Sequence, residues 1–304
     1  MSISVGILGT GWVGSSVAIS VLHAGVATEL LLADARAELA EGEAMDLAHG
    51  AAFYPSASVR AVPQEGLLNT DALVIAAGRN GTPNQSRLEL LQDNATILRE
   101  IGASLRGYRG IVIVVTNPVD VLTQIVQESS GLPPARVIGT GTMLDTARLR
   151  QTIGEEIGVD PRSVHAQVIG EHGDSEVVLW SSAHVGGLPL RDWPGWSRDR
   201  EPAIAQTVRR AGFEIIRRKG ATNHAIGLVT AALLRTLLRG ERRVETVSHV
   251  QSGALGLSGV ALSLPTILDA SGAGEVLGVP LEPEERLALD ASAGVLRAAR
   301  ASVS

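Results

Sequence analysis

The sequence predicts an α/β fold, with a doubly wound parallel sheet in the first half of the chain and a mixed α+β arrangement in the second. Short apolar runs alternate with longer stretches of helical period as far as about residue 140. These runs are almost continuous in Val, Ile and Leu, as expected of parallel strands covered by helices on both faces. Beyond that point the regular alternation stops. We therefore expect a Rossmann-type domain at residues 1–140 and a mixed α+β substrate domain at residues 141–304.

The first half contains five predicted strands separated by helices. The strands are ISVGILG (3–9), ELLLAD (29–34), SVRAV (58–62), DALVIAAG (71–78) and GIVIVVTNP (110–118), of which SVRAV has the weakest pattern. Helical patterns cover residues 13–24, 36–49 and 87–106. Strands that alternate with helices of this length imply right-handed crossovers, and hence a parallel sheet.

The second half is predicted to contain four helices and two pairs of strands. The helices are expected at residues 143–157, 201–219, 221–238 and 283–301. The first strand pair is SVHAQVIG (163–170) and SEVVLWSSAHV (175–185), joined by an EHGD turn, and the second is RRVETVSHV (242–250) and SGVALSLPTIL (258–268). This order favours an α+β domain.

Composition excludes several classes of protein. The chain has 304 residues, is 45% hydrophobic and 19% charged, and carries a formal net charge of −6. Such a mildly acidic globular chain offers no broad electrostatic footprint for nucleic acid. It contains no cysteine, which excludes disulfides and thiolate metal ligands, and we predict no metal site. The N-terminus does not read as a signal peptide, and the uncharged stretch 250–268 fits two strands better than a membrane span, so we expect a cytoplasmic protein.

A dinucleotide fingerprint follows the first predicted strand. In GILGTGWVGSS, Gly9 would allow the tight turn, Gly11 would let the backbone approach a pyrophosphate, and Gly14 would let helix and strand pack closely. The helix N-terminus then directs free N–H groups at the phosphates. Asp34 ends the next strand, where a carboxylate can accept hydrogen bonds from ribose hydroxyls and repel a 2′-phosphate. The motif in this context favours NAD over NADP.

Three further patterns contain residue types suited to catalysis. Arg87 follows a loop that contains glycine and proline, and Asp145 and Arg148 lie three residues apart on one helix face. His172 lies in VIGEHGDSEV, a turn at the end of an apolar run. Taken singly, each pattern is more often structural: a helix-start arginine, a surface ion pair and a histidine at a strand end. Taken together, they indicate a catalytic site.

These motifs together resemble the L-lactate/malate dehydrogenase family along essentially the whole chain, and most resemble its bacterial L-lactate dehydrogenases. They occur in the family's order: GTGWVG, Asp34, AAGRNGTPNQSR, VTNPVD, GTMLDTAR, VIGEHGDSEV and RKGAT. The resemblance implies an NAD-dependent oxidoreductase that interconverts a 2-oxo acid and an L-2-hydroxy acid. Pyruvate and L-lactate are the expected pair, with malate dehydrogenase or a broader L-2-hydroxyacid dehydrogenase as the alternative.

The resemblance also implies a proton-transfer pair. His172 would be the acid/base catalyst, which gives a proton to the 2-oxo group during reduction and accepts it during oxidation. Histidine suits this role because its ordinary pKa is close to neutral pH. Asp145 would hold the other ring nitrogen and stabilise the imidazolium.

Four other residues would bind the substrate and the cofactor. Arg148 would hold the substrate carboxylate with a bidentate guanidinium, a geometry that lysine lacks. Arg87 would polarise the carbonyl and stabilise the charge that develops on it. Asn117, in TNPVD, would hydrogen-bond near the nicotinamide and the reacting oxygen. Ile226 would pack against the nicotinamide ring.

The residue at the family's specificity position departs from both known patterns. Malate enzymes place arginine there and lactate enzymes glutamine, whereas this chain has Gly81. Glycine offers no charge for a second carboxylate, although Arg79 lies two residues away. Thr222 and Leu88 match the lactate-type residues, and so does the form of GEHGDSEV. Gly81 and Gly212 together imply a roomy pocket that also accepts larger 2-oxo acids.

Regulation and assembly follow from the same resemblance. Arg150 and His165 match the positions at which bacterial members bind fructose 1,6-bisphosphate between subunits, so we expect a homotetramer activated by that anion. Two unconnected basic residues would be the simpler interpretation. A catalytically silent NAD-binding sensor on the same fold is a separate hypothesis. The joint presence of His172, Asp145, Arg87 and Arg148 argues against it.

Overall fold

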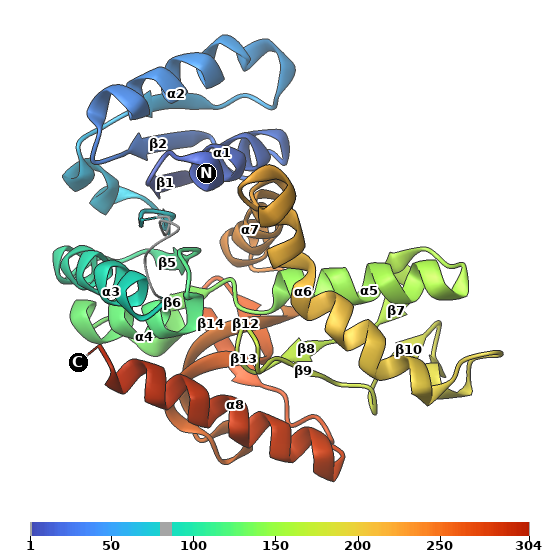
Figure 1. The fold of residues 1–304 in the computed structure, drawn as a ribbon. Helices are drawn as coiled ribbons and strands as arrows, with labels where there is room; N and C mark the ends of the chain where they lie inside the picture. Colours follow the sequence, from blue (N-terminus) through green and yellow to red (C-terminus); the bar gives the residue numbers. More distant parts are fainter. Residues whose placement is uncertain (1, 80–86, 304) are drawn as a thin grey trace.

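The computed structural model describes residues 2–79 and 87–303, together covering nearly all of the sequence (Figure 1). Gly81 lies outside the described residues. For Arg87 the structure describes the backbone, which begins a helix, but not the side chain. No helix in the described part of the chain has the length and apolar composition needed to cross a membrane.

The first half forms the predicted parallel sheet. Its strands are β1 (Ser4–Leu8), β2 (Glu29–Ala33), β3 (Ser58–Ala61), β4 (Ala72–Ile75), β5 (Ile111–Val114) and β6 (Val137–Gly139). They lie side by side in the order β3-β2-β1-β4-β5-β6 and are parallel throughout. The strand order reverses between β1 and β4, and ligands of doubly wound sheets bind beyond the carboxyl ends of the strands at such a point.

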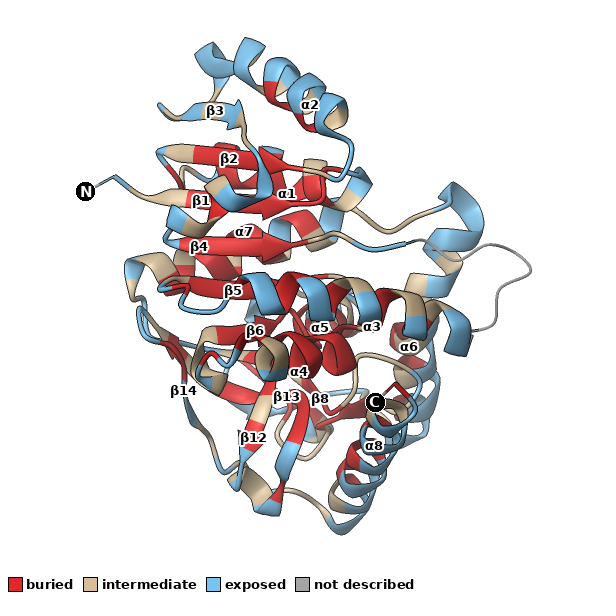
Figure 2. Ribbon diagram, turned by 90° about the vertical axis from the view of Figure 1, so that its left-hand side faces the viewer, coloured by how far each residue is buried: buried red, intermediate tan, exposed pale blue. Residues whose placement is uncertain are grey.

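Helices cover both faces of this sheet, as the apolar strands require. One face is packed by α1 (Trp12–His23) and α2 (Ala37–His49), and the other by α3 (Arg87–Ser104) and α4 (Val119–Ser130). Figure 2 shows the central strands almost entirely buried, whereas the helices expose their outer sides. The doubly wound prediction is therefore confirmed.

The second half of the chain extends the same sheet. After α5 (Met143–Ile157), α6 (Glu201–Lys219) and α7 (His224–Arg239), three antiparallel strands continue beyond β6 in the order β6-β12-β13-β14. These strands are β12 (Arg243–Ser252), β13 (Ser258–Asp269) and β14 (Gly272–Val276). The final helix, α8 (Pro283–Ala301), packs on β13 and on β9 (Val177–Val178). The sheet thus runs without interruption across the expected boundary at residues 140/141.

Helix α7 lies against α1, although it belongs to the second half of the sequence. Ala231, Leu233, Leu234 and Leu237 of α7 are buried in the same core as the apolar residues of α1 and β1. The two backbones approach closely, because a Cβ at Gly227 would lie 2.4 Å from the carbonyl oxygen of Ser16. Asn223 Nδ2 donates to Ser16 Oγ at 2.8 Å. The cofactor half is therefore completed by a helix from the substrate half.

The expected strands around the EHGD turn are shorter than predicted. Residues 163–185 form four two-residue strands: β7 (Val164–His165), β8 (Val168–Ile169), β9 (Val177–Val178) and β10 (His184–Val185). β7 pairs with β10, which also pairs with β11 (Leu188–Pro189), whereas β8 pairs with β9. His165 therefore lies on a different sheet from the strand that leads to His172, which corrects the expectation of one continuous strand. The helix α4 and the strands β6 and β14 were not predicted.

Candidate active site

The glycine-rich turn lies at the carboxyl end of β1, beside the point where the strand order reverses. Gly9 has a φ of +95°, and a Cβ there would lie 2.5 Å from the backbone nitrogen of Ala77. A Cβ at Gly14 would lie 1.8 Å from the carbonyl oxygen of Gly9. Gly11 differs, because a Cβ there would meet nothing within 4 Å. Gly9 and Gly14 are thus required by the turn itself, whereas the open space at Gly11 suits the approach of a pyrophosphate.

The N-terminus of α1 and the carboxylate of Asp34 complete this edge. Gly11 is the N-cap of α1, no side chain caps the helix, and no acidic residue lies in its first turn. An N-terminus of this kind binds anions through its free N–H groups. Asp34 follows β2, and its Oδ2 accepts from Thr10 N at 2.8 Å while its Oδ1 accepts from Arg36 N at 2.9 Å. The described residues therefore fit NAD, with phosphates at α1 and a ribose at Asp34.

His172 and Asp145 form a direct pair. The Nδ1 of His172 lies 2.5 Å from Asp145 Oδ2, and the carboxylate side chain is only 3% exposed. Asp145 lies in the first turn of α5, and His172 in the turn after β8. Because Nδ1 is bonded to the carboxylate, Nε2 is the nitrogen left for a substrate, and no described residue hydrogen-bonds it. The His172 side chain is 26% exposed, which leaves room for access.

Arg148 is held by the other oxygen of the same carboxylate. Its Nη1 donates to Asp145 Oδ1 at 2.9 Å, and its side chain is 15% exposed. A Cβ at Gly212 would lie 3.8 Å from this guanidinium, so the small residue on α6 keeps space beside it. Asp145 thus orients the proposed proton donor and the proposed carboxylate binder together.

The charges of this cluster favour a protonated histidine. Burial alone would lower the pKa of His172, but the charge of Asp145 and its hydrogen bond raise the pKa to about 9. Burial would likewise raise the pKa of Asp145, but the charges of His172 and Arg148 hold it below its usual value. The imidazolium therefore persists at neutral pH in the absence of ligand, as a proton donor for reduction requires.

Asp120 is a site residue that the sequence reasoning missed. Its Oδ2 accepts from the backbone N–H of His172 at 2.7 Å, so it fixes the position of the turn that bears the histidine. The carboxylate is 2% exposed, and burial raises its pKa to about 6. Asp120 is the last residue of the VTNPVD motif, so the signal was present, but its burial is not visible in a sequence.

The other expected residues are distributed around this edge. Asn117 follows β5, and its Oδ1 accepts from Val119 N at 3.3 Å, which leaves its amide N–H groups as donors. Thr222 and Ile226 lie at the junction of α6 and α7, where Ile226 packs half-buried against the core around α1. Neither has a described contact with His172. Gly81 and the side chain of Arg87 are not described, so their expected positions are not tested.

Arg150 of α5 is bonded to the chain segment that contains His165. Arg150 Nε donates to the carbonyl of Ala166 at 3.1 Å, next to His165, which is exposed. Burial lowers the pKa of Arg150, an effect that Glu245 opposes and Arg243 reinforces. The Arg150 guanidinium is therefore close to the backbone next to His165, and the carboxylate of Glu245 also acts on its charge.

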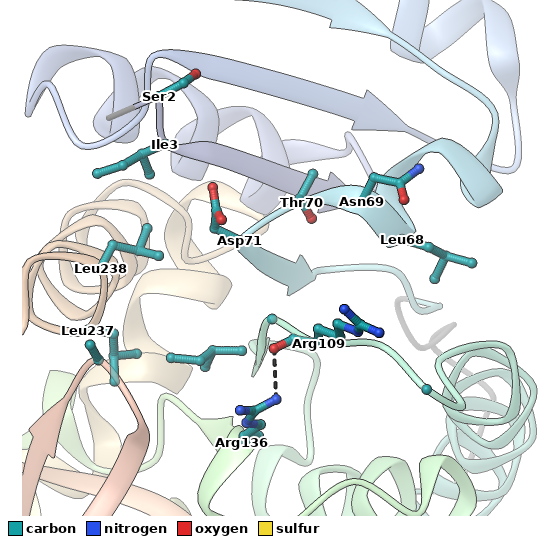
Figure 3. Close-up of a pocket in the computed structure, with 14 residues that line it drawn as sticks. Ser2, Ile3, Leu68, Asn69, Thr70, Asp71, Arg109, Arg136, Leu237 and Leu238 are labelled. Atoms are coloured by element: carbon teal, nitrogen blue, oxygen red, sulfur yellow. Dashed lines mark hydrogen bonds between the residues drawn. The ribbon is translucent and has the colours of Figure 1, made fainter.

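A separate cavity of about 700 Å³ lies at the opposite edge of the sheet (Figure 3). Ile3, Asp71 and Ile111, which line it, precede or begin β1, β4 and β5, so it opens at the amino ends of the strands. Arg136 Nη1 donates to the carbonyl of Arg109 within it at 2.8 Å. Its lining contains neither the glycine turn nor His172, so it is not part of the candidate active site.

The parallel sheet, the glycine turn with Asp34, and the His172–Asp145–Arg148 cluster define a nicotinamide-dependent dehydrogenase acting on an anionic substrate. Two family models match the chain: lactate/malate dehydrogenase, NAD binding domain, at residues 3–139, and lactate/malate dehydrogenase, alpha/beta C-terminal domain, at residues 142–303. The chain belongs to the lactate/malate dehydrogenase family, and it binds NAD.

Relatives and solved structures cover almost the whole chain. The L-lactate dehydrogenase of Salinibacter ruber is 44% identical over 99% of this chain and 98% of its own length. That of Kosmotoga olearia is 42% identical over 98% of this chain and 96% of its own length. The minor L-lactate dehydrogenase of Enterococcus mundtii in its ligands-bound form superimposes with a TM-score of 0.97 at 39% identity, covering 100% of this chain and 99% of that one. Its ligands-unbound form gives 0.92 at 38% identity and similar coverage, so the present fold is closer to the ligands-bound form.

Proposed function

We propose that the protein is an L-lactate dehydrogenase that interconverts pyruvate and L-lactate with NAD. The observation that supports this most directly is the single carboxylate of Asp145, which holds both His172 and Arg148. A 2-oxo acid carries a carbonyl and a carboxylate on adjacent carbons. In the cluster, a proton donor and a guanidinium are bonded to the two oxygens of one carboxylate, so they are close enough to bind the carbonyl and the carboxylate of one substrate molecule. The relatives named above, all L-lactate dehydrogenases, support the same substrate.

Reduction of the substrate requires a proton at the carbonyl oxygen. Bound NADH supplies the hydride, and His172 donates the proton from Nε2 because Nδ1 is bonded to Asp145. Asp145 stabilises the charged ring before transfer and fixes the tautomer of the neutral ring afterwards. In the oxidation of lactate, the neutral ring accepts the proton at Nε2. Asp120 holds the backbone of His172 in place during both reduction and oxidation.

Binding of the substrate carboxylate is assigned to Arg148. One edge of its guanidinium is occupied by Asp145, and the remaining N–H donors can form a bidentate pair with the substrate. The shared carboxylate therefore sets the distance between the carboxylate binder and the proton donor. We assign to Arg87 the stabilisation of charge on the carbonyl oxygen, and to Thr222 and Gly81 the walls of the pocket.

Substrate preference is tested by comparing kcat/KM for pyruvate and oxaloacetate with NADH. We expect pyruvate to be much the better substrate, because Gly81 has no charge to pair with a second carboxylate and an unpaired buried carboxylate costs several kcal/mol. Gly81→Arg should shift the preference toward oxaloacetate. A higher kcat/KM for oxaloacetate in the unmodified enzyme would favour the malate alternative. No turnover with any 2-oxo acid, together with intact NADH binding, would favour the sensor hypothesis.

We also assign an anion site to Arg150 and His165. The hydrogen bond from Arg150 to the residue that follows His165 supports the expected activation by fructose 1,6-bisphosphate, since an anion bound there would act on α5, which carries Asp145 and Arg148. Such couplings are typically about 1–3 kcal/mol. The bisphosphate should lower KM for pyruvate several-fold, more strongly at pH 6 than at pH 8, and Arg150→Gln should remove the effect. Saturation curves that coincide with and without the bisphosphate at both pH values would contradict this assignment.

Exposed apolar side chains support assembly with further copies of the chain. Helices α1 and α6 expose Trp12 (62%), Phe213 (64%) and Ile216 (50%), and Phe53 (85%) lines a groove beside α1. Large exposed apolar patches mark association surfaces. We propose a homotetramer in which further copies of the chain cover these exposed side chains. Analytical ultracentrifugation should give four chains per particle, and Phe213→Lys combined with Phe53→Lys should reduce that number. A cytoplasmic location remains a prediction from the sequence.

A further inference from the structure

A buried glutamate that the mechanism does not use lies just behind the catalytic cluster. Glu176 is 5% exposed, and its Oε1 has no hydrogen-bond partner among the described residues. Arg209, on α6, is nearby, because its Nη2 lies 3.4 Å from the carbonyl oxygen of Glu176. Arg209 Nε is also buried and without a described partner. The buried wall of the site thus contains an acceptor and a donor that both lack a hydrogen-bond partner among the described residues.

The groups that face Glu176 come from each element packed around it. Asp145 and Arg148 of α5, Arg209 of α6 and His172 of the preceding turn all act on its charge. On α8, Glu285 accepts from the backbone N–H of Ser181 at 3.0 Å and from its hydroxyl at 2.6 Å, so this carboxylate is bonded elsewhere. Glu176 therefore shares the electrostatic environment of the catalytic pair and of the carboxylate binder.

We propose that Glu176 is a positioning residue that must be protonated for the enzyme to bind its 2-oxo acid tightly. The proposal rests on the function assigned above and adds a second proton to the binding step, besides the proton on His172. An ionised Glu176 would add a second protein carboxylate to the charges that act on Arg148, and so would compete with the substrate for that guanidinium. With Glu176 protonated, Asp145 is the one ion-pair partner that the described residues give Arg148, and the substrate carboxylate becomes the second.

The surroundings of Glu176 keep it protonated at neutral pH. Burial and then the charge of Asp145 raise its pKa, against the opposing charges of Arg209, His172 and Arg148, to about 8. An incoming substrate carboxylate adds another negative charge, which raises this pKa further. If an anion binds more tightly to the enzyme with Glu176 protonated, the enzyme takes up a proton when that anion binds at a pH above the pKa of free Glu176.

Proton counting tests the proposal on the unmodified protein. The probe is oxamate, an unreactive analogue of pyruvate, titrated calorimetrically into the enzyme saturated with NADH. Comparing buffers of different ionisation enthalpy gives the number of protons taken up. At pH 9.5, protonation of His172 and Glu176 together should take up clearly more than one proton. His172 alone takes up at most one proton, so a count of one or less overturns the proposal.

A charge-neutral variant gives the second readout. In Glu176→Gln, the rise in the Kd of oxamate between pH 6.5 and pH 9.5 should be about 30-fold smaller than in the unmodified enzyme, since one of the two ionisations is removed. Glu155→Gln, the same change at an exposed position of α5, should keep the full rise. A Glu176→Gln enzyme with the unmodified rise also overturns the proposal. If this variant does not fold, the proton count still decides.

The two proposals fail in different ways. If the enzyme with NADH binds oxamate at pH 6.5 but takes up only one proton at pH 9.5, the role of Glu176 is wrong and the proposed function stands. If oxamate does not bind at either pH and pyruvate is not reduced, the proposed function itself is wrong.

Discussion

Replacing Asp145 with Asn tests the electrostatic origin of the proton donor. The carboxylate contacts Nδ1 of His172 at 2.5 Å and raises the pKa of the ring to about 9 against its burial. With a neutral amide the burial remains, so we expect the pKa of His172 to fall to about 6.5 or lower, a change equivalent to about 3 kcal/mol. At pH 7.5 the charged fraction of His172 then drops from about 97% to about 9%.

The assay is the pH profile of kcat/KM for pyruvate between pH 5.5 and 9.5. Protonation alone should cost about tenfold at pH 7.5 in Asp145→Asn, and the loss should shrink as the pH is lowered toward 5.5. Asp160→Asn, at an exposed carboxylate paired with Arg162, serves as the matched control and should keep the unmodified profile. A loss of activity in Asp145→Asn that is the same at every pH would refute this reasoning, because it would mean that Asp145 acts by geometry alone.

Three other predictions follow from named contacts. Asp34→Ser should raise kcat/KM for NADPH relative to NADH at least about tenfold, because it removes the charge that opposes a 2′-phosphate, and an unchanged ratio would contradict the role of Asp34. Gly11→Ala should fold but bind NADH more weakly in a fluorescence titration, whereas Gly14→Ala should lose thermal stability, since only at Gly14 would the new Cβ overlap backbone, 1.8 Å from Gly9 O. Burial lowers the pKa of His249 to about 4, so its contribution to stability is intact above pH 6.5 and is lost as the pH falls toward 4. Between pH 7.5 and pH 4.5, the free energy of unfolding in urea should fall by about 2–3 kcal/mol less in His249→Gln than in the unmodified protein. An equal fall in both proteins would contradict the assignment.

The parallel core could be predicted because its strands are buried on both faces. Runs such as LVIA and IVIVV have no polar residue to face solvent, so they predict strands that are buried on both faces. The glycine turn between the first strand and the first helix fixes the order of these two elements. Helix α4 was missed although VDVLTQIVQESS places its apolar and polar residues at a helical period. All eight residues from Val119 to Val126 are buried, so the polar side of this helix also lies inside the protein. The joining of β12 to β6 was missed because it depends on pairing between distant segments, which no local pattern encodes.

The site was predicted as far as its motifs reached. His172, Asp145 and Arg148 are recognisable by residue type and spacing, and the structure places them in contact. Asp120 bonds the backbone of His172, and the Glu176 carboxylate shares the charges of the cluster, but the roles of both depend on burial. An acidic residue at either position would look like a solvated charge in a sequence, and only the packing of α4, α5 and α6 around them makes their protonation state matter.

The packing of α7 on α1 bears on how this protein can be divided. A fragment that ended at residue 140 would retain the glycine turn and every parallel strand, yet it would lack the four buried side chains of α7 that complete its core. The uncovered apolar face beside α1 would then favour aggregation. Exchange of the cofactor half between relatives would similarly require α7 to be exchanged with it, and in particular Gly227, because any larger residue there would meet Ser16. The part of this protein that can be exchanged as one structural unit is therefore discontinuous in sequence. It consists of the first half of the chain together with helix α7 from the second half.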